Sequence, residues 1–335
     1  MTADRIAVVG GGSWGTAFAV MLAERHADVA LWVREPEVCA DIRERGENRV
    51  FLPGVRVPRA VRPTTDLGEA VDGRTVVAFA VPSQHLRDVA ERAAALLSPG
   101  AALVSLAKGV ETGTLLRTTE VLGQVLGVPA ARLAVLSGPT FAREVAEGKP
   151  AGATVASGDK VLAVALQAVL SGSRFRLYAE TDVTGIEIGG ALKNVMAIAA
   201  GMADGLGFGS NARALLISRG LAEIARLGAA LGADPRTFSG LAGLGDLVLT
   251  CTGDLSRNRS LGVRVGRGER VADILAGMTM VVEGVETARA AVDLSRATGV
   301  PMPISDQVYL ILHEGKDVRA AVSELFARSL KMEKD

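Results

Sequence analysis

Short apolar runs alternate with amphipathic stretches along the first half of the chain. The runs are rich in Val, Ile and Leu, as in strands buried on both faces, and the stretches between them repeat apolar residues every three or four positions, as in helices. Such alternation indicates parallel strands joined by helices. It predicts strands at residues 5–9, 29–33, 75–79, 101–105 and 133–136, with a sheet extension at 153–156 and 174–178, and helices at 15–25, 36–45, 83–97, 115–126 and 160–170.

The pattern changes after Tyr178. From Asp182 to Leu330 no strand pattern occurs, and apolar residues recur at helical spacing between glycine-containing breaks. A chain of 335 residues is more than twice the ~150 typical of one domain. We therefore expect two domains: a doubly wound, mostly parallel α/β domain over residues 1–180 and an all-α domain over residues 181–335. The segment 46–63 carries three prolines and is expected to be a long loop near the site.

Composition narrows the function classes. Lys plus Arg equals Asp plus Glu at 37 each, so no net basic field favours nucleic acid or an anionic membrane. Mean hydropathy is high at +0.30, yet no apolar stretch approaches the ~18 residues of a spanning helix, and four glycines interrupt the stretch from Ile6 to Ala23 that most resembles a signal peptide. Cys39 and Cys251 are far apart and only three histidines occur, which argues against a disulfide framework or a metal site and favours a reducing cytoplasm.

A glycine-rich turn follows the first predicted strand. Residues 10–15, Gly-Gly-Gly-Ser-Trp-Gly, have the GxGxxG spacing and open a helix within a βαβ unit. In a Rossmann-like domain Gly10 permits the tight turn, Gly12 lets a pyrophosphate approach the backbone, and Gly15 allows close helix packing. The N–H groups of the first helical turn then face the phosphates. This context predicts a dinucleotide site.

The residue after the second strand bears on the choice of dinucleotide. An acid there hydrogen-bonds the ribose 2′-hydroxyl of NAD, whereas an arginine accommodates the 2′-phosphate of NADP. The strand ends Leu31-Trp32-Val33-Arg34-Glu35, with Arg34 at the expected spacing. Arg34 favours NADP, and Glu35 beside it keeps NAD open.

Three predicted strands end in polar residues at the edge of the sheet where ligands of open α/β sheets bind. Lys108 follows the fourth strand and is a candidate for contact with a substrate phosphate or the cofactor. Ser137-Gly138-Pro139-Thr140 follows the fifth strand. His85, after the third strand, is a weaker acid/base candidate because a histidine at a helix start usually lies on the surface.

Lys193 is the sharpest feature of the second half. It is the only charged residue from Ile188 to Ala203. Burial in such a helix lowers the pKa of an ammonium and suits it to proton transfer near neutral pH. Asp246 is likewise the only charge from Gly240 to Gly253, with Thr250 on the same helix face. An isolated buried carboxylate needs a partner, and Lys193 is the natural one.

An anion site is predicted shortly after Asp246. Ser256-Arg257-Asn258-Arg259 lies in a stretch without acids from Leu255 to Gly268, and arginine binds phosphate through paired hydrogen bonds. Glu283 reads equally as a helix cap or a cofactor contact. A nicotinamide nucleotide, a buried lysine, an aspartate and an anion pocket are together typical of hydride exchange with a small phosphorylated ketone or alcohol.

Several runs resemble the bacterial NAD(P)-dependent glycerol-3-phosphate dehydrogenase family. They are Gly-Gly-Gly-Ser-Trp-Gly-Thr-Ala at 10–17, Leu-Ser-Gly-Pro-Thr-Phe-Ala at 136–142, Gly-Ala-Leu-Lys-Asn-Val-Met-Ala at 190–197, Gly-Leu-Gly-Asp-Leu at 243–247, Ser-Arg-Asn at 256–258 and Val-Val-Glu-Gly-Val at 281–285. The resemblance covers nearly the whole chain in order. It implies reversible reduction of dihydroxyacetone phosphate to sn-glycerol 3-phosphate, which supplies glycerophospholipid synthesis, in a homodimeric enzyme.

The resemblance also implies roles for individual residues. Lys193 is implied as the acid/base, with Asp246 orienting it. The implied substrate contacts are Lys108, Gly138, Thr140, Asp246, Ser256, Arg257 and Asn258. The implied cofactor contacts, together with Gly10, Gly12 and Gly15 of the turn, are Ser13, Trp14, Arg34, Lys108, Ala142, Arg257, Val281 and Glu283.

Two other functions stay open at this point. A two-domain dehydrogenase for a hydroxyacyl or 2-hydroxy acid substrate shares the plan, but it usually needs a histidine acid/base or an arginine aimed at a carboxylate. A non-catalytic NADP sensor would not need the set of Lys193, Asp246, Arg257 and Asn258. A nucleic-acid-binding protein has neither a basic stripe nor an aromatic platform in this sequence.

Overall fold

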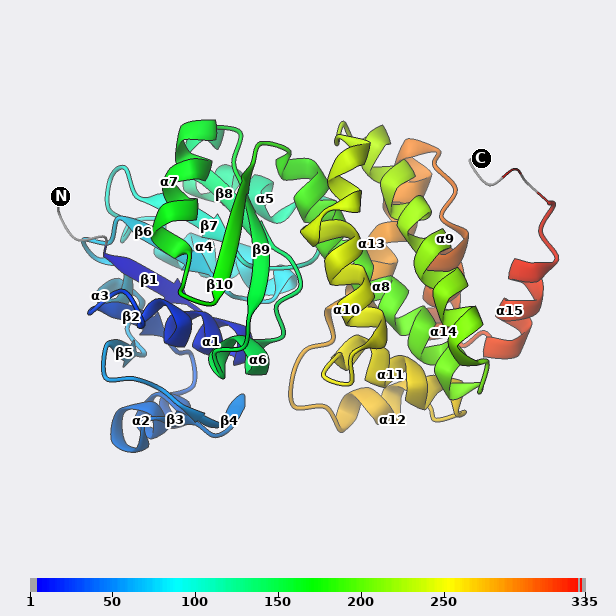
Figure 1. The fold of residues 1–335 in the computed structure, drawn as a ribbon, viewed down its shortest axis with the longest axis horizontal. Coiled ribbons are helices and arrows are strands. Elements are labelled where there is room, and N and C mark those ends of the chain that lie inside the picture. Colours follow the sequence, from blue (N-terminus) through cyan, green and yellow to red (C-terminus); the bar gives the residue numbers. More distant parts are fainter. Residues whose placement is uncertain (1–4, 331, 333–335) are drawn as a thin grey trace.

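The computed structural model describes residues 5–330 and Met332. The sheet with its helices forms one half of the molecule and a bundle of helices forms the other (Figure 1). The site residues predicted from the sequence come from both halves, so the site is expected where the two halves meet.

An eight-stranded sheet organises the first half, in the order β10-β9-β8-β7-β6-β1-β2-β5. Neighbouring strands are parallel except β8 and β9, which are antiparallel. The expected α/β class with a mostly parallel sheet is therefore confirmed. The strands are β1 (Ile6–Val9), β2 (Val29–Trp32), β5 (Val61–Thr64), β6 (Val76–Phe79), β7 (Ala102–Ser105), β8 (Leu133–Ser137), β9 (Ala151–Ala156) and β10 (Phe175–Glu180).

Helices cover both faces of this sheet. Because side chains alternate along a strand, Ile6 and Val8 of β1 join one apolar cluster, with Phe18, while Ala7 and Val9 join the other, with Phe79. Both faces are dry, which explains the continuous apolar runs of the sequence. The helices of this half are α1 (Ser13–Leu22), α2 (Pro36–Arg45), α3 (Leu67–Val71), α4 (Leu86–Ala93), α5 (Thr118–Leu126), α6 (Ala142–Ala146) and α7 (Lys160–Leu170).

The expectation of a long loop over residues 46–63 is wrong. This segment contains the antiparallel pair β3 (Glu47–Asn48) and β4 (Leu52–Arg56) and most of β5, which pairs with β2. Its prolines suggested a loop, but β5 is the outermost strand, where a missing N–H leaves no ladder bond unmade.

Two helix starts also differ from expectation. The stretch from Ser83 begins with a 3₁₀ turn to His85 before α4, and α5 begins at Thr118 rather than at Leu115. Leu115 has a φ of 60°, in the left-handed region, so the chain cannot be helical there. Both differences lie at segments that contact the helical half, through Glu283 and through the core packed by Leu115.

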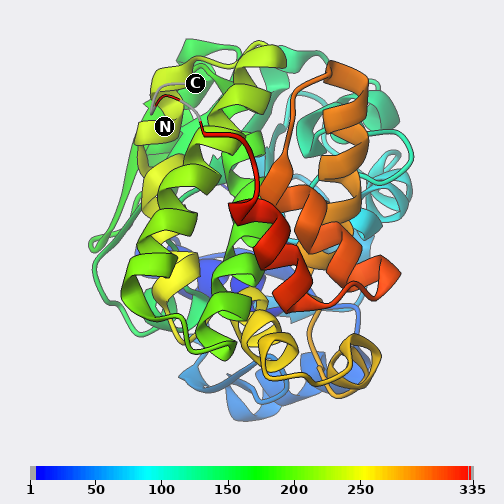
Figure 2. The same ribbon diagram turned by 90° about the vertical axis from the view of Figure 1, so that its right-hand side faces the viewer.

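The described residues of the second half form helices joined by turns and contain no strand, as predicted from the sequence. Figure 2 shows this bundle from its outer side. Two short turns, Pro235–Ser239 (3₁₀) and Leu241–Gly245 (π-helical), precede α10. The helices are α8 (Val183–Gly205), α9 (Gly209–Ala230), α10 (Asp246–Thr252), α11 (Arg257–Gly266), α12 (Val271–Ala276), α13 (Glu283–Thr298), α14 (Pro303–Glu314) and α15 (Val318–Phe326).

Helix α8 is the centre of the bundle and packs against α9, α10, α11 and α13. It is also the one helix among the described residues that is long and apolar enough to cross a membrane, but its apolar window is completely buried within the molecule. Its hydropathy therefore reflects its position as the core helix, on which Lys193 is buried.

Candidate active site

Four segments converge where the carboxyl ends of β7 and β8 meet the helical half. Lys108 follows β7, Gly138 follows β8, Lys193 lies in the middle of α8, and Asp246 is the first residue of α10. The sequence placed Lys193 and Asp246 together, and the structure brings Lys108 and Gly138 to the same point. Lys193 and Asp246 are buried, with 6% and 1% of their surface exposed.

The Asp246 carboxylate lies between the two lysines. Lys193 Nζ donates to Oδ1 at 2.6 Å, and Lys108 Nζ donates to Oδ2 at 2.7 Å. Lys193 also donates to Thr250 Oγ1 at 2.9 Å, and Lys108 donates to the Gly138 carbonyl at 2.9 Å. An ammonium has three hydrogens. Each lysine, when charged, therefore keeps one N–H for a ligand.

The environment of Lys193 brings its proton affinity into the physiological range. The pKa of Lys193 is lowered from 10.5 to about 7, chiefly by burial and also by the charge of Lys108, against the opposing effect of Asp246. Desolvation dominates because the side chain is enclosed by the apolar core around α8. Near neutral pH this ammonium can both donate and recover a proton.

The glycine-rich turn has the shape required to hold a dinucleotide. Gly10 has a φ of 125°, and a Cβ there would lie 2.6 Å from the Ala80 carbonyl oxygen. A Cβ on Gly15 would lie 1.9 Å from the Gly10 carbonyl oxygen, so both positions exclude a side chain. A Cβ on Gly12 would meet nothing within 4 Å, and Gly12 caps α1, whose helix begins at Ser13. Open space at a helix N-terminus fits a pyrophosphate.

Arg34 lies just beyond β2, where the ribose of a dinucleotide is expected. Its side chain is 70% exposed and forms an ion pair with Glu35, Nη2 to Oε1 at 2.6 Å. Trp14 in α1 packs its ring against Phe18 and Phe175, and its indole N–H is buried without a partner among the described residues. The Trp14 ring is thus partly buried and packs against the core of the sheet domain.

The predicted anion site lies at the start of α11. Ser256 caps this helix and accepts from the Arg259 N–H, and Arg257 is its first residue. Arg257 Nη1 donates to the Val281 carbonyl at 2.7 Å, which ties the guanidinium to the segment before α13. Burial lowers the pKa of Arg257, opposed by Glu283. An arginine guanidinium stays protonated in proteins, so Arg257 is a cation.

Asn258 and Glu283 join segments that are far apart in the sequence. Asn258 Nδ2 donates to Asn194 Oδ1 at 2.9 Å, and its Oδ1 accepts from the Gly284 N–H at 3.0 Å. Glu283, the first residue of α13, accepts from the Ser83 hydroxyl at 2.7 Å and from its N–H. Glu283 therefore joins the two halves.

The two remaining predicted contacts lie in the first half, after β8. Thr140 Oγ1 donates to the Gly138 carbonyl, and Ala142 begins α6 beside α1.

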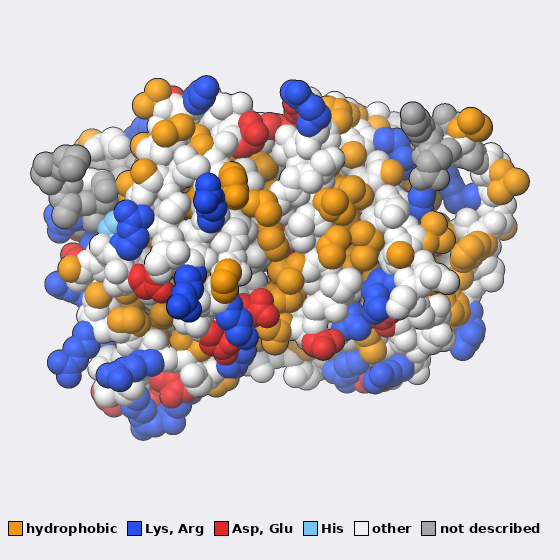
Figure 3. Space-filling view, in the orientation of Figure 1, with side chains coloured by type: hydrophobic (Ala, Val, Ile, Leu, Met, Phe, Trp, Pro, Cys, Tyr) orange, Lys and Arg blue, Asp and Glu red, His pale blue; other side chains and the backbone are white. Residues whose placement is uncertain are grey.

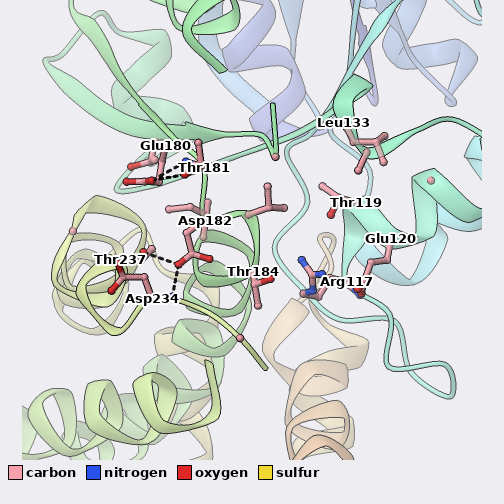
Figure 4. A pocket seen from close by; sticks show the side chains of 18 of the residues that line it. Arg117, Thr119, Glu120, Leu133, Glu180, Thr181, Asp182, Thr184, Asp234 and Thr237 are labelled. Carbon is pink, nitrogen blue, oxygen red and sulfur yellow. Dashed lines mark hydrogen bonds and ion pairs between the residues drawn. The ribbon is translucent and has the colours of Figure 1, made fainter. Parts of the chain in front are cut away.

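A large groove lies elsewhere. A groove of about 1220 Å³ runs between the two halves and is lined by Arg117, Glu120, Asp182, Asp234 and Thr237 among others (Figure 4). None of the site residues predicted from the sequence lines it. Four of its charged side chains form ion pairs, Arg117 with Glu120 and Asp234 with Arg236, while Glu180 and Asp182 accept hydrogen bonds from Thr181 and Thr237.

Comparison with known proteins decides the family. Residues 5–163 match the N-terminal region, and residues 182–323 the C-terminal region, of NAD-dependent glycerol-3-phosphate dehydrogenase. The chain belongs to this family. It is 51% identical over 332 residues to glycerol-3-phosphate dehydrogenase (NAD(P)+) of Geobacter sulfurreducens, covering 99% of each chain. The crystal structure of glycerol-3-phosphate dehydrogenase from Coxiella burnetii superposes with a TM-score of 0.93 at 38% identity, covering 97% of this chain and 99% of that one.

The glycerol-3-phosphate dehydrogenase family shares its fold with other oxidoreductases. A ketopantoate reductase from Ralstonia eutropha superposes with a TM-score of 0.61 at 19% identity, covering 96% of this chain and 99% of that one. This likeness concerns the fold alone. The shared fold explains why the pattern of strands and helices did not exclude the function of a 2-hydroxy acid dehydrogenase. The residues around Lys193, in contrast, indicated the glycerol-3-phosphate dehydrogenase family.

Two polar residues at the centre of this family member received no role from the sequence. Thr250 accepts from Lys193. Asn194 Nδ2 donates to the Lys108 carbonyl at 3.2 Å, and Asn194 Oδ1 accepts from Asn258. Asn194 is polar within a buried apolar helix directly after Lys193, and that position was the available signal. His85, the weaker acid/base candidate, is exposed and lies outside this hydrogen-bond network.

Proposed function

We propose that this chain is an NAD(P)-dependent sn-glycerol-3-phosphate dehydrogenase that reversibly reduces dihydroxyacetone phosphate. One observation carries the proposal: two lysines share the buried Asp246 carboxylate, and each keeps one N–H for a ligand. Two convergent cationic donors suit a carbonyl oxygen that becomes an alkoxide. The family assignment agrees with this chemistry.

Lys193 is the proposed acid/base. In the reductive direction its ammonium donates a hydrogen bond to the C2 carbonyl oxygen and delivers its proton as negative charge develops there. In the oxidative direction the neutral amine takes the proton of the C2 hydroxyl. A pKa of about 7 allows both directions near neutral pH. Asp246 and Thr250 hold the Nζ atom, so its free N–H has a fixed direction.

Substrate binding is proposed to rest on the remaining donors. Lys108, Gly138 and Thr140 lie beside the reacting carbon, while the start of α11, with Ser256, Arg257 and Asn258, takes the phosphate. Binding the phosphate away from the reacting carbon positions that carbon against Lys193. The Asn258 amide already donates one of its two N–H groups to Asn194, so Arg257 is the principal phosphate ligand in this proposal.

The nicotinamide nucleotide, when bound, supplies or accepts the hydride at C2 of the substrate. The residues proposed to hold it are Gly10, Gly12, Ser13, Trp14 and Gly15 of the turn, with Arg34, Lys108, Ala142, Arg257, Val281 and Glu283 around it. The open space at Gly12 supports the pyrophosphate position. Among the described residues no cluster of metal-ligand side chains occurs, and the proposed steps need none.

The proposal is tested by the rate of NADPH and NADH oxidation with dihydroxyacetone phosphate and with unphosphorylated dihydroxyacetone. Rapid turnover that requires the phosphate is expected. Tight NADPH binding without turnover on dihydroxyacetone phosphate would reject this substrate, and activity with a 2-hydroxy or hydroxyacyl substrate in its place would assign the chain to the alternative class of dehydrogenase.

NADP is the proposed preferred cofactor, because an arginine at position 34 suits a 2′-phosphate. Replacing Arg34 with glutamine should raise KM for NADPH about tenfold, the loss of one charge-assisted contact, and leave KM for NADH within about twofold. Steady-state kinetics with both cofactors measure this. The exposed Arg236, which pairs with Asp234 outside the proposed cofactor site, offers Arg236→Gln as the matched control. Equal effects on both cofactors would remove Arg34 from the 2′-phosphate site.

We also propose that the chain functions in the cytoplasm in glycerophospholipid synthesis and that it divides into domains near residue 180.

The chain is further proposed to form a homodimer. Apolar side chains gather where β10 and α10 face the viewer in Figure 3, and Tyr178, Leu244 and Val248 are each at least 39% exposed. Such an exposed apolar area suits a protein interface. Sedimentation equilibrium distinguishes a dimer from the 34.6 kDa monomer.

A further inference from the structure

The loop that carries Lys108 is anchored in the helical half. It runs from the end of β7 to the start of α5, over residues 106–117. Val110 is 1% exposed and belongs to the apolar core of the helical bundle, and Leu115 packs against the same core. The left-handed backbone of Leu115 turns the chain back there, and Val110 and Arg117 form a β-bridge across the loop. The position of Lys108 is therefore set by the bundle as well as by the sheet.

Glu187 of α8 holds the far end of this loop. Its carboxylate accepts from Arg117 Nη1 at 2.6 Å, Thr118 Oγ1 at 2.7 Å, the Thr119 N–H at 2.7 Å and Thr119 Oγ1 at 2.9 Å. Only 1% of its side chain is exposed. Charge-assisted bonds to a buried carboxylate are strong and geometrically specific. Four such donors satisfy both oxygens and fix the start of α5 against α8.

The near end of the loop is held by the same helix. Asn194 Nδ2 donates to the Lys108 carbonyl at 3.2 Å. Glu187 precedes Lys193 by less than two helical turns, and Asn194 follows it directly. Helix α8 thus binds the loop at both ends, and Lys193 lies between the two attachments. The distance between the Lys108 and Lys193 ammoniums depends on both of them.

We propose that Glu187 is a positioning residue of the dehydrogenase reaction, which locks the 106–117 loop onto α8 and thereby holds Lys108 and Lys193 on opposite oxygens of Asp246. Glu187 touches neither reacting atoms nor their direct partners, and it acts through the loop. This inference rests on the proposed function only for its assay, since the geometry of the two lysines exists without substrate.

The effect should appear in the titration of Lys193. The groups facing Lys193 are Asp246, Lys108 and the Cys251 thiol, and among them the Lys108 charge lowers the pKa of Lys193. A loosened loop lets Lys108 withdraw and water enter, and both changes raise the pKa of Lys193. In the reductive direction the protonated lysine then persists to higher pH, so the alkaline loss of kcat moves to higher pH.

The structure provides a matched control in Glu120. This residue of α5 accepts from the same guanidinium, Arg117 Nη2 to Oε1 at 2.7 Å, but it has no bond to α8. Figure 4 shows Arg117 and Glu120 together on one wall of the large groove. Glu120→Gln therefore removes one partner of Arg117 and leaves the link between loop and α8 intact.

The experiment compares Glu187→Gln and Glu120→Gln with the unmodified protein by kcat, KM and the pH profile of dihydroxyacetone phosphate reduction, with the melting temperature alongside. Glu187→Gln should lower kcat about tenfold, as expected for a small misplacement of catalytic groups, and move the alkaline limb to higher pH. Glu120→Gln should keep both within about twofold.

Wild-type kcat and pH profile in Glu187→Gln would overturn the proposal, whatever its melting temperature, because Glu187 would then be structural only. If Glu187→Gln does not fold, Thr119→Val removes one donor to Glu187 and decides by the same profile. Failure of the proposed function is distinguishable, since the unmodified protein would then show no turnover of dihydroxyacetone phosphate.

Discussion

Replacing Lys193 with methionine should lower kcat for dihydroxyacetone phosphate reduction by about 10³-fold, near the middle of the range for losing a general acid. Methionine fills much of the buried volume without an ammonium, so the cavity cost stays small. Cofactor affinity should change little, because Lys193 lies on α8, whereas the glycine-rich turn follows β1, two strands away from β7 in the sheet. Stopped-flow measurement of NADPH binding and of single-turnover reduction separates the two quantities.

The pH dependence supplies a second signature. Below about pH 7 the folded protein holds Lys193 as the ammonium, and above it as the amine. Reduction needs the ammonium, so wild-type kcat should fall as pH rises through about 7, and oxidation should show the opposite trend. The methionine variant should lose this limb. Lys149→Met, at an exposed lysine paired with Glu147, is the control. Near wild-type turnover in the Lys193 variant would move the acid/base elsewhere.

The predictable parts of the fold are those dictated by short-range pattern. The helices at 36–45 and 160–170 have the predicted bounds. In the sequence a proline marks the start of α2, and an aspartate cap marks the start of α7. Strand β5 could not be predicted, since proline disfavours strands in general and only its place at the sheet edge permits it. The position of a strand in its sheet is set by tertiary structure, which the local sequence pattern does not show.

The same division applies to the site. A lone charge in an apolar helix identifies Lys193, and the need for a counter-charge identifies Asp246. Nothing local indicates that Lys108 shares that carboxylate, because 138 residues separate the two and the contact arises only when the loop docks into the helical core. The role of Glu187 could not be predicted either. Its four donors lie on residues 117–119, where the sequence pattern predicted the interior of a helix and the structure has the start of α5.

Replacing Asp246 with asparagine should damage stability and catalysis together. The amide keeps the shape but cannot accept from both lysines, and it leaves the buried Lys193 and the partly buried Lys108 without their counter-charge. Breaking a buried ion pair from one side costs about 3–5 kcal/mol of unfolding free energy. Loss of the carboxylate also lowers the pKa of Lys193 below about 7, since Asp246 is what raises it. At neutral pH the lysine is then largely neutral, and kcat for reduction should fall about 10²-fold or more.

The stability deficit of Asp246→Asn should shrink as pH rises. The pKa of Lys193 is depressed in the folded state relative to its ordinary 10.5, so the unfolded chain binds more protons between those values, and stability increases with pH across that interval. Above about pH 7 Lys193 is neutral in both folded proteins, so the two stability curves run in parallel and only the Lys108 pair is lost. Below about pH 7 the wild-type protein gains the charged Lys193–Asp246 pair, which the variant lacks, so the deficit should be larger at pH 6 than at pH 9. Denaturant unfolding at the two pH values measures the difference, with Asp254→Asn, at an exposed aspartate 97% accessible, as the isosteric control. A deficit that is constant with pH would mean that Asp246 does not hold the charge of Lys193.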